Sequence, residues 1–373
     1  MRRLTPLAAL ATCAIALSCL SCDDVIFDTI RQEIRLEDAQ IKGTVNSIVR
    51  YTLEGEEYLF CQNGAVWKKS VDAAIKKENE DSTVLGGSWS EPYSSQWVRV
   101  QSPDSNVIKL AADETYLYAL VAPTYADNED TGDNIEAGRK VYFTTDGEDW
   151  ELVDVDGSTT LATTSSNIFC TNTPQPAHRR AYLRVGATIY ELSGEKTTTP
   201  MKTGSDDHST TPTTSTKSVT MLGDDTPYFS SGYAMCSNET RENPATYIYY
   251  SDGDDLYYSS DGTTWTKAGD PGNTIYAMAY TKDHLLLGTL NGLLHVNVDG
   301  DGVPSGSATD FDTNAESTLS SYYQVRTIIA VDPSLTETEG DLYGSTAFSG
   351  TTASFSNVCL WAYYPGRGKW NCE

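Results

Sequence analysis

The chain of 373 residues holds 52 acidic side chains against 26 basic ones, giving a net charge of −26 and an isoelectric point near 4.4. Nucleic-acid binding depends on basic patches that release counterions from phosphates, so this charge argues against a nucleic-acid partner and against anionic membrane surfaces. Hydrophobic residues make up 39% of the chain and aromatic residues 10%, a composition that supports a folded core.

The first 21 residues have the pattern of an export signal. Met1-Arg2-Arg3 is basic, an apolar stretch runs from Leu7 to Leu20, and Asp23-Asp24 turns the chain polar. This stretch is shorter than the roughly 20 residues that span a bilayer, so we expect a secretory signal rather than a membrane helix. No later segment reaches that length, and we expect membrane contact only through an N-terminal lipid.

Two short segments mark candidate ends of the signal. Leu20-Ser21-Cys22, with Leu17-Ser18-Cys19 as the alternative, resembles the bacterial lipobox, in which the cysteine is lipidated and becomes the mature N-terminus. A cysteine or an alanine stands three positions before the cysteine, where leucine is usual, a looseness similar to that of spirochaete lipoproteins. The resemblance implies lipidation at Cys22, or alternatively at Cys19. We expect an exported protein anchored by lipid to a bacterial membrane, with the outer membrane or cell surface preferred and the inner membrane as the alternative.

Residues 22–43 are predicted to form an anchor and linker, and residues 44–373 an all-β propeller of four-stranded antiparallel blades. Six blades are the first choice and seven the alternative. Within the linker, Val25–Lys42 is a candidate closing strand for the last blade. The innermost strands are short runs rich in Ile, Val, Tyr and Ala, a composition that indicates packing on both faces. They are expected at Ser47–Tyr51, Val107–Ala111, Asn167–Thr171, Tyr233–Ser237, Ile275–Tyr280 and Arg326–Val331.

Three further strands are expected to follow in most of the blades. The second strands are predicted at Tyr58–Cys61, Tyr116–Val121, Ala181–Val185, Tyr247–Tyr250, His284–Gly288 and Asp341–Ser345. The third strands are predicted at Ala65–Lys68, Lys140–Phe143, Thr188–Leu192, Leu256–Tyr258, Leu293–Val298 and Val358–Tyr363. Fourth strands are predicted at Trp97–Val100, Trp150–Val153, Trp265–Lys267 and Lys369–Asn371, and the third and fifth units show no clear one.

Doubled tyrosines support sheets that are covered on both sides. The 23 tyrosines include the pairs Tyr249-Tyr250 and Tyr257-Tyr258. Successive strand residues point to opposite faces, so each pair sends one ring to either side of its sheet. Propeller blades meet this condition because each blade packs between two neighbours.

One short pattern occurs twice, each time after a tyrosine-bearing strand. Its copies are Thr144-Thr145-Asp146-Gly147-Glu148-Asp149-Trp150 and Ser259-Ser260-Asp261-Gly262-Thr263-Thr264-Trp265. The pattern resembles the Asp-box, or BNR repeat, of sialidases, sortilin-type receptors and photosystem assembly factors, although Asp and Gly are adjacent here. Physically, the Asp carboxylate accepts backbone N–H groups, the Gly takes a positive φ and the Trp packs into the sheet. We therefore assign a structural role to Thr144, Asp146, Gly147, Trp150, Ser259, Asp261, Gly262 and Trp265.

The Asp-box resemblance makes a sialidase-like glycoside hydrolase the alternative function. That family uses three arginines around a substrate carboxylate, a Tyr–Glu pair and an Asp, with the first arginine in a Phe/Tyr-Arg-Ile-Pro element. The chain lacks this element, and its nearest echoes are Arg50 and Arg326. The third arginine would have to be Arg139, Arg184 or Arg241, with nothing to single one out. We therefore predict no catalytic set.

The remaining side chains give no further chemistry. The four histidines lack metal-ligand spacing, and a calcium-like start at Asn297–Gly302 has Ala308 where the loop needs an acid, so no metal and no cofactor are predicted. Cys170 and Cys236 occupy matching places on neighbouring innermost strands and form a candidate disulfide. The expected function is a lipid-anchored, extracytoplasmic, non-catalytic binding or scaffolding module. Loops around Tyr125–Gly138 and Lys196–Lys217 would contact a protein or glycan partner.

Overall fold

The computed structural model divides the chain into Met1–Asp38 and Ala39–Glu373. It describes residues 39–372 except 72–96, 105, 123–124, 128–133, 137, 154–159, 162–165, 186–187, 193–233, 241–242, 261–263, 270, 282–283, 311–318, 320–322, 332–346, 354–357 and 365–368. The export signal, Cys19, Cys22 and the loop at Lys196–Lys217 lie outside the described residues. The division into signal, linker and propeller therefore stays a prediction.

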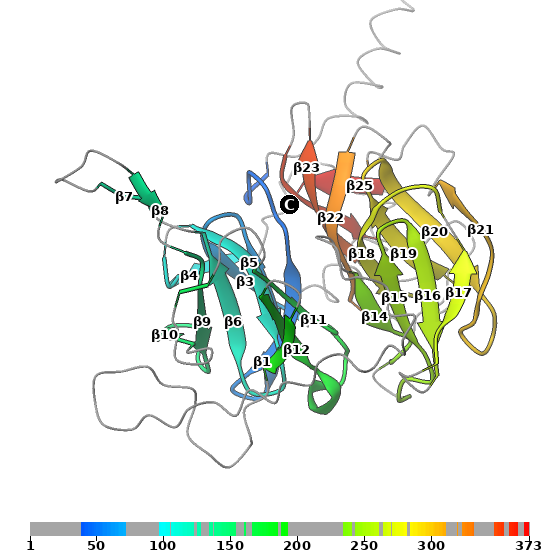
Figure 1. Cartoon of the computed structure of the whole chain (residues 1–373), viewed down its shortest axis with the longest axis horizontal. Helices are drawn as coiled ribbons and strands as arrows, with labels where there is room; N and C mark the ends of the chain where they lie inside the picture. The colour runs from blue at the N-terminus through cyan, green and yellow to red at the C-terminus, as the bar shows by residue number, and fades with distance from the viewer. Residues whose placement is uncertain are drawn as a thin grey trace, which may run out of the picture. The chain divides into compact units, whose positions relative to one another are not determined.

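The described residues form a succession of small antiparallel sheets, which we call blades 1 to 6 (Figure 1). Blade 1 contains β1 (Ile48–Leu53), β2 (Glu56–Gln62), β3 (Val66–Ser70) and β4 (Val98–Val100). Blade 2 contains β5 (Val107–Ala112), β6 (Leu117–Val121), β9 (Lys140–Thr144) and β10 (Glu151–Leu152). A two-stranded ribbon of β7 (Tyr125–Asp127) and β8 (Asn134–Glu136) is inserted between β6 and β9. Blade 3 contains β11 (Asn167–Cys170), β12 (Ala181–Val185) and β13 (Thr188–Leu192).

The second half of the chain repeats the arrangement. Blade 4 contains β14 (Met235–Ser237), β15 (Ile248–Asp252), β16 (Asp255–Ser259) and β17 (Thr266–Gly269). Blade 5 contains β18 (Ile275–Tyr280), β19 (His284–Thr289), β20 (Gly292–Val298) and β21 (Pro304–Asp310). Blade 6 contains β22 (Tyr323–Ala330), β23 (Ala347–Ala353), β24 (Leu360–Tyr364) and β25 (Lys369–Cys372). A short 3-10 helix, η1 (Pro176–His178), lies between β11 and β12, and no described helix has the length and apolarity to cross a membrane.

Each blade packs against the next, in most cases through a shared apolar cluster. Separate clusters join blade 1 to blade 2, blade 2 to blade 3, blade 3 to blade 4, and blade 4 to blade 5. Strand β18 of blade 5 lies against β22 of blade 6. A further cluster joins blade 6 back to blade 1 through Ile48, Leu59, Ile329 and Leu360. The succession of contacts therefore closes on itself, and the fold is a β-propeller, as predicted. The choice between six and seven blades for the whole chain stays a prediction.

The start and the end of the described chain meet at the junction of blades 1 and 6. Lys42 forms an isolated antiparallel bridge with Cys359. Gly43 N donates to Val358 O at 2.8 Å, and Leu360 N donates to Ile41 O at 3.0 Å. Val25–Asp38 lies outside the described residues, so the predicted closing strand is seen only as this short contact.

The doubled tyrosines divide between the two faces of blade 4, as the sequence predicts. Tyr249 and Tyr258 face the cluster shared with blade 5, whereas Tyr250 and Tyr257 face the cluster shared with blade 3. Both Tyr249 and Tyr250 are 0% exposed. Adjacent residues of one strand are therefore buried on opposite sides, which requires a neighbour on each face.

Two strand predictions need correction. The second strand of blade 6 is β23, not Asp341–Ser345, which falls within the undescribed residues 332–346. Its sequence, Ala-Phe-Ser-Gly-Thr-Thr-Ala, is poor in the large apolar residues that signal a buried strand. Blade 5 has a fourth strand, β21, whose polar, glycine-containing sequence gave no signal, whereas the described part of blade 3 has three strands.

Candidate functional site

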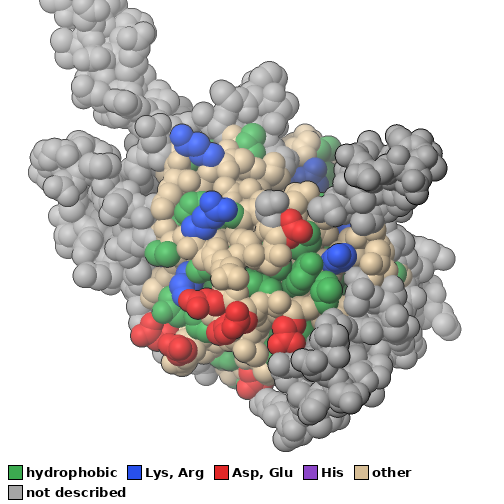
Figure 2. All heavy atoms as spheres, turned by 90° about the vertical axis from the view of Figure 1, so that its left-hand side faces the viewer, with side chains coloured by type: hydrophobic (Ala, Val, Ile, Leu, Met, Phe, Trp, Pro, Cys, Tyr) green, Lys and Arg blue, Asp and Glu red, His purple; other side chains and the backbone are tan. Residues whose placement is uncertain are grey.

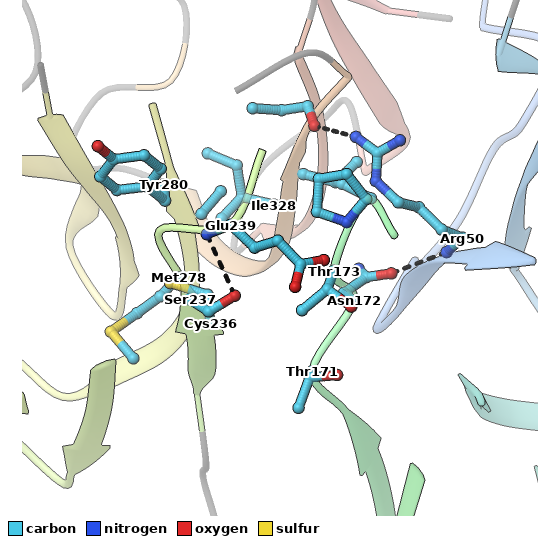
Figure 3. Close-up of a pocket in the computed structure, with 14 residues that line it drawn as sticks. Arg50, Thr171, Asn172, Thr173, Cys236, Ser237, Glu239, Met278, Tyr280 and Ile328 are labelled. Carbon is cyan, nitrogen blue, oxygen red and sulfur yellow. Dashed lines mark hydrogen bonds between the residues drawn. The ribbon is translucent and has the colours of Figure 1, made fainter. Parts of the chain in front are cut away.

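The innermost strands of several blades end around one small pocket (Figure 3). It lies where β1, β11, β14, β18 and β22 converge. Its lining residues are Arg50, Thr171, Asn172, Thr173, Pro174, Cys236, Ser237, Glu239, Met278, Ala279, Tyr280, Ile328, Ile329 and Ala330. The cavity has a volume of about 40 Å³. This is room for a few water molecules and far less than the several hundred Å³ of ordinary small-molecule sites.

Asn172 crosses the pocket and ties blade 3 to blade 1. Its Oδ1 accepts the N–H of Arg50 at 2.7 Å (Figure 3). Its Nδ2 donates to the carbonyl of Ile48 at 2.8 Å. The residue adopts φ of 57°, a left-handed conformation that asparagine tolerates better than most residues. The amide therefore replaces the hydrogen bonds that a further strand would have supplied.

A cluster of two buried arginines and one partly exposed glutamate lies beside the pocket. Arg50 Nη1 donates to Glu57 Oε1 at 3.3 Å, and Arg179 Nη2 donates to the same oxygen. Both arginines are 1% exposed. Burial lowers the pKa of Arg179 to about 10, and the Arg50 charge adds to this, although the Glu57 carboxylate opposes it. The guanidinium of Arg50 also donates to the carbonyls of Ala330 and Val331 on blade 6.

A second carboxylate near the axis belongs to Glu239, which is 1% exposed. Its Oε1 accepts the backbone N–H of Gln175 at 3.0 Å, and its Oε2 lies 2.5 Å from His178 Nδ1. Gln175 Nε2 donates to the carbonyl of Thr240 at 3.1 Å. These contacts join blade 3 to blade 4, so Glu239 holds two blades together.

Arg326, the second arginine that the sequence analysis compares with the sialidase element, lies on β22 and stacks on an aromatic ring. Its guanidinium carbon is 3.9 Å from the centroid of the Tyr276 ring on β18, and its Nη2 donates to Gln324. Burial lowers the pKa of Lys109 on β5 to about 8, and the Arg326 charge contributes to the lowering. Arg50 and Arg326 are therefore engaged by different neighbours.

The first copy of the repeated pattern forms the turn between β9 and β10. Asp146 Oδ1 accepts the N–H groups of Glu148 and Asp149 and the hydroxyl of Thr144, at 2.8–2.9 Å. These hydrogen bonds, that of Glu148 first, hold the pKa of Asp146 below its usual range. Gly147 has φ of 76°, and Trp150 packs beside the cluster of blades 1 and 2.

The second copy is described only in part, because Asp261 and Gly262 lie outside the described residues. Ser259 ends β16 and is 2% exposed. Trp265 packs edge-on against Tyr250 with ring centroids 5.8 Å apart, in the cluster of blades 3 and 4. Both tryptophans thus pack toward the blade that precedes their own.

Cys170 and Cys236, the predicted disulfide partners, are free thiols in the structure, as are Cys61, Cys359 and Cys372, so their pairing stays a prediction. Cys170 packs against the clusters that blade 2 shares with its neighbours, whereas Cys236 belongs to the cluster of blades 4 and 5. The two side chains occupy matching strands but point toward different interfaces. Burial raises the pKa of each thiol, which keeps both in the unreactive form.

Three turns at one end of blades 1 and 2 gather acidic side chains. Tyr51 Oη lies 2.8 Å from the carbonyl oxygen of Thr115 and 2.9 Å from that of Thr145, and its single proton is shared between them. This places the β5–β6 and β9–β10 turns beside the end of β1. Figure 2 shows acidic side chains gathered along one edge of the face that it views. We call the following set the acidic turn surface: Glu54, Glu56, Glu114, Asp146, Glu148 and Asp149.

A buried carboxylate, Asp113, underlies this surface. Its Oδ1 accepts the N–H groups of Thr115 and Tyr116, and its Oδ2 accepts the hydroxyl of Tyr118, at 2.7–2.8 Å. Burial nevertheless raises the pKa of Asp113 from 3.8 to about 6. As the pH rises, the Asp113 carboxyl loses its proton at a lower pH in the unfolded chain than in the folded protein. At low pH this residue therefore stabilises the folded state.

We expect this effect to be lost as the pH rises from about 4 to about 6. A shift of this size corresponds to about 3 kcal/mol of unfolding free energy. In Asp113→Asn the side chain cannot ionise, and Tyr118 Oη can donate instead to the carbonyl of Leu192, 3.3 Å away. Denaturant unfolding at pH 4 and pH 7 should therefore show a larger loss in the wild type than in Asp113→Asn. Equal losses in the two proteins would contradict the assignment.

No protein-family model matches this sequence, and no curated protein matches it. Among solved structures, the chain is similar to a chain of the nidogen/laminin complex at 9% identity, with 85% of this chain and 93% of that chain covered and a TM-score of 0.45. It is similar to YCF48 from Cyanidioschyzon merolae at 10% identity, with coverage of 91% and 87% and a TM-score of 0.37. It is also similar to SapL1 lectin in complex with alpha methyl fucoside at 13% identity, with coverage of 87% and 94% and a TM-score of 0.41. We transfer no ligand or activity from these proteins to this chain.

Most of the polar and charged residues at the pocket and beside it were not identified from the sequence. Glu57, Asn172, Arg179 and Glu239 each lie outside any recognisable motif and come together only through the fold. The candidates that the sequence offers for a third arginine are Arg139, Arg184 and Arg241, of which Arg241 lies outside the described residues. The arginine that joins Arg50 is instead Arg179, which follows η1.

Proposed function

We propose that this protein is an exported, lipid-anchored β-propeller that binds a protein or glycan partner without catalysing a reaction. The observation that carries the proposal is the acidic turn surface on blades 1 and 2. Its side chains stand on short turns that the sheets hold in place, and a rigid charged surface suits recognition. A net charge of −26 favours a partner with a basic or neutral contact surface.

The arrangement near the axis supports a binding function over hydrolysis. A glycosidase of the sialidase type needs arginines that present their donors to a substrate carboxylate. Here the Arg50 guanidinium donates to Glu57, Ala330 and Val331, and the pocket beside it holds about 40 Å³. The sequence around Cys22 supports the lipid anchor and the export.

The binding test uses the Cys22→Ser chain as bait, because loss of the lipid should move it from the membrane to the soluble fraction. Partners captured with this bait are identified and their association rates measured at low and high salt. We expect the rate to fall at high salt, and to fall about tenfold when Glu54, Glu56, Glu148 and Asp149 are replaced by their amides. Asp146 stays unchanged because it holds the turn.

A control with half this change in charge replaces two exposed acids elsewhere by asparagine: Asp254 between β15 and β16, and Asp301 between β20 and β21. This control should bind like the parent chain. If neutralising the acidic turn surface changes the rate no more than the control does, the proposed surface is wrong. Release of sialic acid from a reporter substrate, lost on Arg50→Ala, would replace the binding function with hydrolysis.

A further inference from the structure

Two cysteines of blade 6 lie side by side at the junction where the propeller closes. Cys359 directly precedes β24, and Cys372 ends β25. Cys372 is paired with Trp361 in the antiparallel ladder, and Cys359 precedes Trp361 by two residues. Residues two apart on a strand point to the same face, so Cys359 and Cys372 are diagonal neighbours on one face of the blade.

The side chains make the contact that this register allows. A side-chain hydrogen bond joins Cys359 and Cys372, and it is the main cause that raises the pKa of the Cys359 thiol, ahead of burial. Cys359 is 1% exposed and Cys372 4% exposed. Both are thiols in this structure. Diagonal neighbours in a ladder lie about 7–8 Å apart, just beyond the range of a disulfide, so the bond requires the backbone to bring the two residues closer together.

The backbone of Cys359 belongs to the closing contact itself. It forms the bridge with Lys42, and its neighbours on either side exchange hydrogen bonds with Ile41 and Gly43. A covalent bond from Cys359 to Cys372 would therefore fasten the final strand, β25, to the point where the first described residues dock.

We propose that Cys359 and Cys372 form a disulfide that secures the closure of the ring. The oxidant is a small or protein-bound disulfide, RSSR. One cysteine thiolate attacks RSSR and forms a mixed disulfide with release of RS⁻, and the second thiolate attacks the sulfur of the first cysteine and releases the second RS⁻. Two protein thiols and RSSR thus give one protein disulfide and two RSH. Because both thiols are buried in the folded ring, the exchange takes place before β25 docks.

Peptide mapping of the full-length protein tests the pairing directly. The chain is extracted from cell membranes with detergent, alkylated in denaturant without reductant, and digested with trypsin. Cleavage after Arg326, Arg367 and Lys369 leaves Cys359 in peptide 327–367 and Cys372 in peptide 370–373. We expect these two peptides joined, at two hydrogens below their summed mass, with Cys61, Cys170 and Cys236 alkylated. Alkylation of both peptides, or linkage of peptide 370–373 to Cys61, overturns the pairing.

A second arm separates this pairing from the export on which it depends in the cell. The purified, reduced chain is refolded in a mixture of glutathione and glutathione disulfide and mapped in the same way. Linkage of 327–367 to 370–373 in this buffer supports the pairing, and reduced protein from the same cells would then place the error in the export. Absence of the linkage in glutathione disulfide overturns the pairing itself.

Thermal unfolding measures the effect on closure. The bond would close a loop of about 14 residues, for which we expect reductant to lower the wild-type Tm by about 4–8 °C. Cys359→Ser and Cys372→Ser should lose this response to reductant, whereas Cys236→Ser, a buried cysteine of another blade, should keep it. A wild-type Tm that is the same with and without reductant overturns the proposed role in closure.

Discussion

Replacement of Glu57 by alanine is expected to destabilise the propeller by about 3–5 kcal/mol. The carboxylate accepts from Arg50 and Arg179, both of which are 1% exposed. Its removal leaves two buried guanidinium groups near each other without the negative charge between them, and an uncompensated buried charge costs more than a lost surface pair. Equilibrium unfolding in denaturant measures the change.

The adjacent residue supplies a control. Glu56 is exposed, and its carboxylate accepts only the hydroxyl of Tyr58 at 2.8 Å, among the contacts that the structure describes. Glu56→Ala should stay within about 0.5 kcal/mol of the wild type. In the double variant Glu57→Ala with Arg179→Met, one of the two stranded charges is gone, so the total loss should be smaller than the sum of the single losses. Equal stability of Glu57→Ala and Glu56→Ala would show that the cluster adds nothing.

The sequence predicts the inner strands well because their composition reflects their environment. A strand such as β18 is packed on both faces, so it carries the run Ile-Tyr-Ala-Met-Ala-Tyr with hardly a polar residue. The doubled tyrosines carry the same information, since only a sheet covered on both sides buries neighbouring rings. The closure of blade 6 onto blade 1 then follows from the same need to cover both faces of every sheet.

Strand β23 shows where composition fails. It lies between β22 and β24, yet its residues are mostly small and polar. Space is limited at Gly350, because the backbone of Val45, just before β1, passes close to it. Glycine occupies such a place because a larger side chain would not fit, and not because glycine favours strands. Because β23 lacks a pattern of large apolar residues, its sequence does not predict a strand.

The cluster of Arg50, Glu57 and Arg179 could not be predicted from the sequence for a different reason. Arg50 and Arg179 are 129 positions apart in the numbering, and Glu57 joins them only after blades 1 and 3 have taken their places. None of the three has a spacing that a motif would record. The two cysteines show a related limit, since matching strand positions do not fix which interface a side chain faces, and Cys170 and Cys236 face different ones.

Gly350→Ala is expected to cost about 3 kcal/mol or more and to weaken the junction of blades 1 and 6. A Cβ at this position of β23 would overlap the carbonyl oxygen of Val45 and would lie 2.7 Å from Cγ2 of Thr327. Neither neighbour can move freely, because Thr327 Oγ1 accepts the N–H of Ile48 at 3.1 Å and Val45 is 0% exposed in the closing cluster. Added volume in such a place forces backbone shifts, which are more costly than side-chain rearrangement.

Two other glycines allow the stability loss expected for Gly350→Ala to be compared with smaller expected losses. In Gly288→Ala the new Cβ would lie 2.7 Å from Cγ1 and 2.9 Å from the carbonyl of Val325, so we expect about 1–3 kcal/mol at the junction of blades 5 and 6. At Gly269 in β17 nothing lies within 4 Å of an added Cβ, so Gly269→Ala should be close to neutral. Denaturant unfolding of the three variants should therefore rank them in the order Gly350, Gly288, Gly269. If Gly350→Ala were as stable as Gly269→Ala, the closing segment would not be held against β23, and the contact that completes the ring would lose its physical basis.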